Sequence, residues 1–139
     1  MNFKSAWKVL LSLMLVFILT FIIFPGVFFD THLVLMKNIG KNEFTWYSLY
    51  VITVFNVMDT VGRKMGGMLN ISFECVALMS ILRSIFVVVA IWIVVLGDGS
   101  TSFLASDTVQ IVNLVLFAFS NGFVSTLCAI KAPAFVAED

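Results

Sequence analysis

Long apolar runs separated by short polar segments form the dominant pattern along this chain. Four runs have about the 20 residues that a helix needs to cross the hydrocarbon core of a bilayer. They predict membrane spans over residues 7–29, 44–61, 75–96 and 109–132. The segments between them are rich in Gly, Ser, Asn, Asp and Lys, as turns are. The pattern predicts an all-α fold, a multi-pass transmembrane helical bundle forming a single membrane domain over residues 1–139.

The composition fits this interpretation and excludes some partners. Of 139 residues, 61% are hydrophobic and 12% are charged, whereas soluble domains carry about 25% charged residues. The formal net charge is zero, so no basic excess favours nucleic acid as a partner. We therefore expect the lipid bilayer to surround this chain.

The distribution of basic residues predicts the orientation of the spans. Loops on the cytoplasmic side of membrane proteins carry an excess of Lys and Arg. One side of the predicted topology collects five basic residues and the other collects Lys37 and Lys41; the five are Lys4, Lys8, Arg63, Lys64 and Lys131. We expect both termini to be cytoplasmic.

No residue pattern indicates an enzyme, a metal site or a cofactor. The chain lacks a nucleophile–base pair, a phosphate-binding loop and a His/Cys cluster, and its single histidine, His32, has no partner at ligand spacing. Cys75 and Cys128 both fall in apolar stretches, where free cysteines behave as small hydrophobic residues. We predict two buried free thiols and no metal.

Charged residues inside the second span require an explanation. Asp or Arg at the centre of a membrane helix costs about 2.5–3.5 kcal/mol. Asp59 and Arg63 are four residues apart, so they share a helix face and can pair. Asn56 joins the same stripe. The pair forms either a substrate-binding site or a structural ion pair in which Arg63 extends to the interface.

Polar and small residues in the other spans predict contacts between helices. Arg83 lies too deep in the third span to reach water easily, and either an interhelical lock or a role in a solute pathway explains it. In the fourth span, Asn121 is expected to hydrogen-bond across helices, and Gly122 beside it permits close backbone approach. Gly62 forms a small-residue pair with Gly66 near the end of the second span.

Four segments of the chain resemble the equilibrative nucleoside transporter family. The run FNVMDTVGRK, at residues 55–64, is similar to the eighth-helix signature of that family. LRSIF, at residues 82–86, resembles its arginine-containing ninth helix, and FAFSNGFVSTLCAIKAP, at residues 117–133, resembles its tenth. The first span, with Phe24 and Pro25, looks like the seventh helix. Met58 and Thr60 depart from the aromatic residues usual beside the aspartate.

The resemblance implies a fold and a function for the chain. The fold is part of a major-facilitator-like bundle, and the activity is facilitated diffusion of nucleosides, with nucleobases as a further substrate class, through alternating access. Asp59 would receive ribose hydroxyls and Arg63 would reach the sugar or the base. We expect a C-terminal part of such a transporter, completed by N-terminal helices missing here and placed in the plasma membrane. The alternative is a small membrane scaffold or a degenerate paralogue that does not transport.

Overall fold

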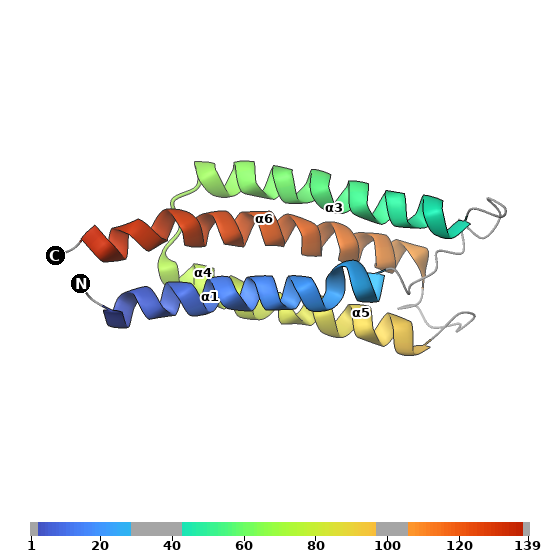
Figure 1. The fold of residues 1–139 in the computed structure, drawn as a ribbon, viewed down its shortest axis with the longest axis horizontal. Coiled ribbons are helices and arrows are strands. Elements are labelled where there is room, and N and C mark those ends of the chain that lie inside the picture. Colours follow the sequence, from blue (N-terminus) through green and yellow to red (C-terminus); the bar gives the residue numbers. More distant parts are fainter. Residues whose placement is uncertain (1–2, 29–42, 97–105, 138–139) are drawn as a thin grey trace.

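The chain folds into a bundle of long helices that run along one common axis (Figure 1). The computed structural model describes residues 3–28, 43–96 and 106–137. The helices are α1 Phe3–Ile22, η1 Ile23–Val27, α3 Glu43–Met68, α4 Phe73–Leu82, α5 Ser84–Leu96 and α6 Asp107–Ala137. The described residues contain no strand, and the prediction of an all-α membrane bundle is confirmed.

Two of the described helical segments are long and apolar enough to cross a membrane, by length and composition alone. They are Glu74–Leu96 and Asp107–Ile130, and Val9–Ile22 is a shorter apolar helix. In hydrocarbon a backbone must satisfy its own hydrogen bonds, and a helix does so within one segment. The apolar runs of this sequence therefore form helices whatever their intrinsic propensity.

The described helices form four rods in chain order: α1 with η1, α3, α4 with α5, and α6. The first rod bends where Pro25 follows Phe24. Phe24 has an extended backbone, with φ −112° and ψ 124°, between two helical stretches. A residue before proline is driven out of the α region by the proline ring. Segment η1 spans this kink, and the helical rod continues beyond it.

The third rod, α4 followed by α5, tightens at Arg83 within the single apolar segment Glu74–Leu96, close to the span predicted over residues 75–96. Arg83 caps α4, and α5 begins at Ser84. The amide of Phe86 donates to the carbonyl of Arg83 over 3.1 Å, which is the spacing of a tightened helical turn. Ser84 donates its hydroxyl to the carbonyl of Ile81 over 2.6 Å. Such bonds back to the preceding turn often bend helices.

The second rod is longer than the predicted span. Helix α3 continues to Met68, about two turns past residue 61, so the connection to α4 is shorter than the sequence indicated. Glycine in a helix interior is unfavourable in isolation. Packing of Gly62 and Gly66 against α6, described below, explains why the helix continues here.

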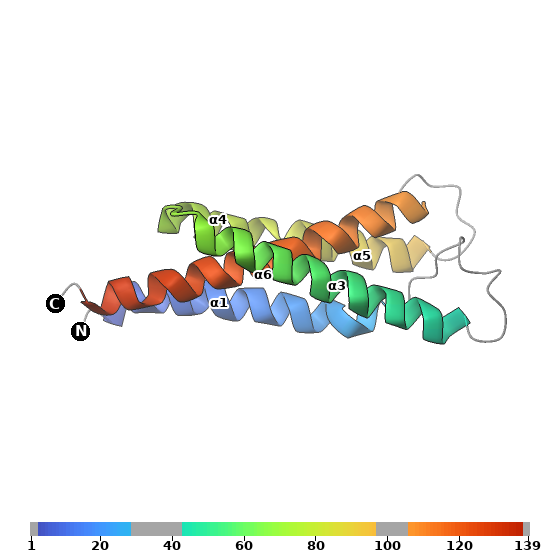
Figure 2. The same ribbon diagram turned by 90° about the horizontal axis from the view of Figure 1, so that it is seen from above.

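Helix α6 is the centre of the bundle. It lies between α3 on one side and α1, α4 and α5 on the other (Figures 1 and 2), and it contacts all four. Figure 2 shows α3 crossing α6 obliquely. The start of α1, the end of α3 and the end of α6 lie at one end of the bundle (Figure 1).

Two apolar clusters fill the interior. The first includes Ile23, Phe55, Phe117 and Ala118. The second, nearer the end that holds the start of α1, includes Val16, Val76 and Leu127. Along the axis of α6, buried polar side chains from several helices lie between these two clusters.

Some expectations lie outside the described residues or need correction. His32, Lys37 and Lys41 fall in residues 29–42, which the structure does not describe. Both cysteines are free; Cys128 is buried, but Cys75 is exposed. The prediction of burial is wrong for Cys75, because the other described residues do not cover its side of α4.

Candidate functional site

Three glycines bring the backbones of α3 and α6 into close contact. A Cβ added at Gly66 would lie 2.7 Å from the carbonyl oxygen of Phe123, and one at Gly62 would lie 2.9 Å from the amide nitrogen of Phe123. A Cβ at Gly122 would overlap the carbonyl oxygen of Asp59. Real Cβ atoms are not found at such distances, so these positions admit only glycine without a shift of the helices. The approach places Asp59 directly beside Asn121.

Asp59 accepts hydrogen bonds on both carboxylate oxygens. The Nε of Arg63 donates to Oδ2 over 2.7 Å, one helical turn away on α3. The amide nitrogen of Asn121 on α6 donates to Oδ1 over 2.7 Å. The side chain of Asp59 is 12% exposed, whereas that of Arg63 is 55% exposed. The pair thus has a buried anion and a cation that extends outward.

Arg83 is the most deeply buried charged residue that the structure describes, at 1% exposed. Its Nη1 donates to Oδ1 of Asn121 over 3.1 Å, and its Nη2 donates to the hydroxyl of Thr20 over 3.2 Å. Its guanidinium carbon lies 4.9 Å from the ring centre of Phe117. This is the geometry of a cation–π contact. Within the described part of the chain, its Nε has no hydrogen-bond partner.

These side chains form one chain of contacts across the bundle, which we call the polar relay: Arg63, Asp59, Asn121, Thr20 and Arg83. Thr20 comes from α1, Asp59 and Arg63 from α3, Arg83 from the α4–α5 junction and Asn121 from α6. The hydroxyl of Thr20 lies 2.7 Å from both Oδ1 of Asn121 and the carbonyl of Val16. Every rod of the structure therefore contributes to the relay.

Sequence reasoning did not single out Thr20. It is one of two hydroxyl residues in residues 9–23, and the other is Ser12. A hydroxyl in a long apolar run was the only available signal, and spacing cannot connect it to residues 101 positions away. For Arg83, the sequence left open an interhelical lock and a role in a solute pathway, and it named no partner. The structure gives an amide and a hydroxyl.

Asn56 does not reach the relay. It is exposed, and its amide nitrogen donates to the carbonyl of Ile52 over 2.9 Å. The hydroxyl of Thr60 likewise donates to the carbonyl of Asn56 over 2.7 Å. Asn56 and Asp59 share the stripe that the spacing implies, but Asp59 lies on its buried edge and Asn56 on its exposed side.

Helix α3 consequently has a buried face against α6 and, about a quarter turn away, an exposed polar stripe. The buried face carries Tyr47, Val51, Phe55, Asp59, Gly62 and Gly66. The exposed polar stripe carries Thr45, Asn56, Thr60 and Arg63, and exposed Leu49 and Ile52 lie along the same face between Thr45 and Asn56. A polar stripe on a membrane helix faces protein or water, because lipid cannot satisfy polar groups.

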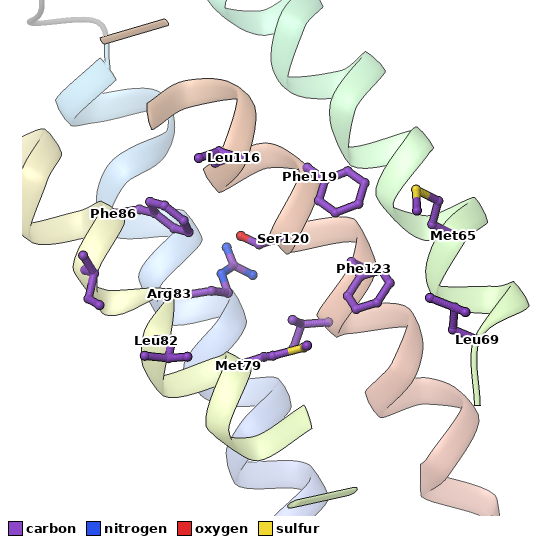
Figure 3. Close-up of a pocket in the computed structure, with 12 residues that line it drawn as sticks. Met65, Leu69, Met79, Leu82, Arg83, Phe86, Leu116, Phe119, Ser120 and Phe123 are labelled. Carbon is purple, nitrogen blue, oxygen red and sulfur yellow. The ribbon is translucent and has the colours of Figure 1, made fainter. Parts of the chain in front are cut away.

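A cavity of about 570 Å³, which Arg83 of the polar relay also lines, lies between α3, α6 and the α4–α5 rod. Figure 3 shows its apolar wall, with Met65, Leu69, Phe119 and Phe123 on one side and Arg83 directed towards Ser120 on α6. Its surface is almost wholly apolar. A nucleoside needs several polar partners, so the chemistry of this cavity suits hydrocarbon better.

Metal binding has no support in the described residues, which contain no cluster of three or more His, Cys, Asp or Glu side chains suited to a metal ion.

Comparison with known proteins identifies the family of this chain. Its sequence is 31% identical over 126 residues to the Arabidopsis thaliana protein named Equilibrative nucleotide transporter 2, covering 88% of this chain and 27% of that protein. The chain thus spans about a quarter of the length of this relative. No solved structure matches it. The family described as Nucleoside transporter matches over residues 1–139, and the chain belongs to this family of membrane transporters.

Proposed function

We propose that this chain forms part of a transporter that moves nucleosides, and nucleobases as a second class, by facilitated diffusion through alternating access. The observation that carries the proposal is the exposed polar stripe of α3 with Arg63 at its end. Such a stripe suits the wall of a water-filled pathway, since it would be costly against lipid.

Asp59 and Arg63 are the proposed substrate-binding residues. Arg63 uses its Nε on Asp59, and its two terminal nitrogens have no partner among the described residues. Guanidinium nitrogens only donate, so they suit the carbonyl oxygens and ring nitrogens of a base or the oxygens of a sugar. Each oxygen of Asp59 has two lone pairs and one donor already, which leaves an acceptor position for a ribose hydroxyl.

The second wall of the pathway must come from elsewhere in the protein. Transporters of this general architecture bind substrate near the membrane midplane between two structural repeats. The polar stripe of α3 is not covered by any described helix, and the relative is far longer than this chain. We propose that N-terminal helices of the same transporter face this stripe.

The membrane and orientation are also proposals. Arg63 and Lys64 lie in the last two turns of α3, which ends at Met68. This end of α3 lies at the same end of the bundle as the start of α1 and the end of α6 (Figure 1). Under the positive-inside rule this end is cytoplasmic, which places both termini of the chain there. We propose the plasma membrane as the site of transport.

Replacement of Asp59 tests the proposal. Asp59→Ala, expressed from the complete reading frame, should reduce uptake of radiolabelled adenosine or inosine to background while surface expression is retained. The matched control is Glu74→Gln, at an exposed acidic residue in the first turn of α4, which should keep normal uptake. Unchanged uptake by Asp59→Ala would disprove the site assignment, whereas absence of uptake by the unaltered protein would favour a scaffold that does not transport.

A further inference from the structure

The side-chain amide of Asn121 lies between a buried cation and a buried anion. On one side Arg83 and Thr20 contact its oxygen, at 3.1 and 2.7 Å. On the other side its nitrogen contacts Oδ1 of Asp59 at 2.7 Å. We infer that Arg83 is a positioning residue, which acts through Asn121 to fix the direction of the Asp59 carboxylate. The inference rests on the proposed function, because it concerns the same site.

The chemistry of the three groups permits only one orientation of the amide. A guanidinium has donors and no acceptor, so the atom of Asn121 that faces Arg83 must be the oxygen. An ionised carboxylate only accepts, so the atom that faces Asp59 must be the nitrogen. Arg83 and Asp59 therefore agree on the same orientation, and each reinforces the contact made by the other.

The burial of these three groups makes the orientation of the Asn121 amide energetically important. Arg83, Asn121 and Asp59 are 1%, 5% and 9% exposed, and the two apolar clusters lie on either side of them. Water cannot readily replace a lost donor there, and an unpaired polar group in such surroundings is strongly unfavourable. Without Arg83, the amide of Asn121 loses the contact that excludes its flipped orientation. A flipped amide would direct its oxygen at the carboxylate of Asp59.

A change in the direction of the Asp59 carboxylate affects the proposed substrate site through one further contact, the one between Asp59 and Arg63. Asp59 holds Arg63 by its Nε, and the side chain of Arg63, part of the polar stripe of α3, is 55% exposed. A carboxylate that rotates away from Asn121 also displaces Arg63. Arg83, which lies on the far side of α6 from α3 (Figure 3), thereby determines the geometry of a site that it does not touch.

Substitutions of Arg83 distinguish positioning from simple support of the fold. Arg83→Met removes the donors, and we expect the KM for adenosine uptake to rise roughly tenfold, the size expected when a hydrogen bond to a charged group is lost. Arg83→Lys keeps one cationic donor for the oxygen of Asn121 and should restore most of the affinity. An unchanged KM in Arg83→Met, measured on protein that reaches the membrane, would overturn the inference.

Asn113 supplies a matched control on the same helix. It is also buried, and its amide nitrogen donates to the carbonyl of Phe86 over 3.2 Å, outside the relay. Asn113→Leu should lower the melting temperature of the detergent-purified protein with little effect on KM, whereas Asn121→Leu should affect both. Equal KM values in the two variants would mean that Asn121 supports only the fold.

Exchange of the two polar groups tests the amide orientation without measuring transport. Asn121→Asp places two carboxylates face to face, and Asp59→Asn places an amide between two donors. The double variant restores a match everywhere, because a carboxylate at position 121 accepts from Arg83, Thr20 and the amide at position 59, whose oxygen accepts from Arg63. We expect both single variants to lose thermal stability and the double variant to recover it.

The exchange separates the two proposals. Recovered stability without recovered uptake supports the inferred orientation, and it also supports the proposal that the substrate needs the charge at Asp59. Recovered stability together with uptake would refute that need while leaving the orientation intact. A double variant no more stable than the single variants would overturn the orientation, whatever happens to uptake.

Discussion

Two exposed surfaces of this bundle have opposite chemistry. The polar stripe of α3 presents Asn56, Thr60 and Arg63, whereas the outer surface of α5 presents only apolar side chains: Ile85 at 55% exposed, Val88 at 57%, Trp92 at 56% and Val95 at 78%. Neither surface is covered by the other residues that the structure describes. The contrast shows that exposure alone does not mean lipid contact, because only the surface of α5 suits hydrocarbon.

The difference also separates the two arginines. Arg63 is largely exposed and pairs with a carboxylate one turn away, so its charge is compensated within α3. Arg83 is buried, and it depends on an amide, a hydroxyl and an aromatic ring from three positions on two other helices. Arg63 is available to a ligand, and Arg83 is committed to the bundle.

A carboxylate added to each surface should produce the largest difference in the amount of correctly inserted protein. Val88→Asp places a carboxylate against hydrocarbon and should cost about 2.5–3.5 kcal/mol, which would remove most of the correctly inserted protein. Asn56→Asp adds the same charge to the polar stripe of α3 and should leave most of the protein inserted. The amount of membrane-extracted, monodisperse protein measures both effects.

Val88→Asn serves as the control for this comparison, since it adds polarity without charge and should fall between the two variants. Equal losses for Val88→Asp and Asn56→Asp would mean that the polar stripe of α3 also faces lipid. The proposed pathway would then have to lie elsewhere.

Replacing glycines of α3 by alanine should change the stability of the protein by a smaller amount. The change should have opposite signs on the two sides of the helix. A Cβ at Gly62 would overlap the carbonyl of Phe119, whereas nothing lies within 4 Å of one at Gly67. Gly62→Ala should destabilise the protein by about 1–3 kcal/mol through overpacking. Gly67→Ala should be neutral or stabilise it by up to about 1 kcal/mol, because alanine favours helix.

Melting temperatures of the two alanine variants in the same detergent give the comparison directly. Stability unaffected by Gly62→Ala would mean that α3 and α6 are further apart than the structure places them. The contact between Asp59 and Asn121 would then be in doubt as well.

The sequence predicted the helices well but not their contacts. Apolar runs in hydrocarbon have to be helical, so the rods follow from composition and length. The spacing of Asp59 and Arg63 predicted their pairing, because both lie on one helix. Residues on different helices have no such fixed spacing, which explains why Thr20 was missed and why the partners of Arg83 could not be named. The continuation of α3 past Gly62 also depends on packing against α6, which local sequence does not reveal.

Exchange of a single hydroxyl between the two surfaces should have the smallest effect. Thr60→Val removes a hydroxyl that already bonds to the carbonyl of Asn56, so stability should change by less than about 0.5 kcal/mol and nucleoside uptake should change only slightly. Val88→Thr adds a hydroxyl to the surface of α5, where it can bond to the carbonyl one turn earlier. It should be tolerated as well. Because each hydroxyl is satisfied by its own helix, the two surfaces differ through their charged and amide groups. A large loss of uptake in Thr60→Val would show instead that this hydroxyl contacts the substrate.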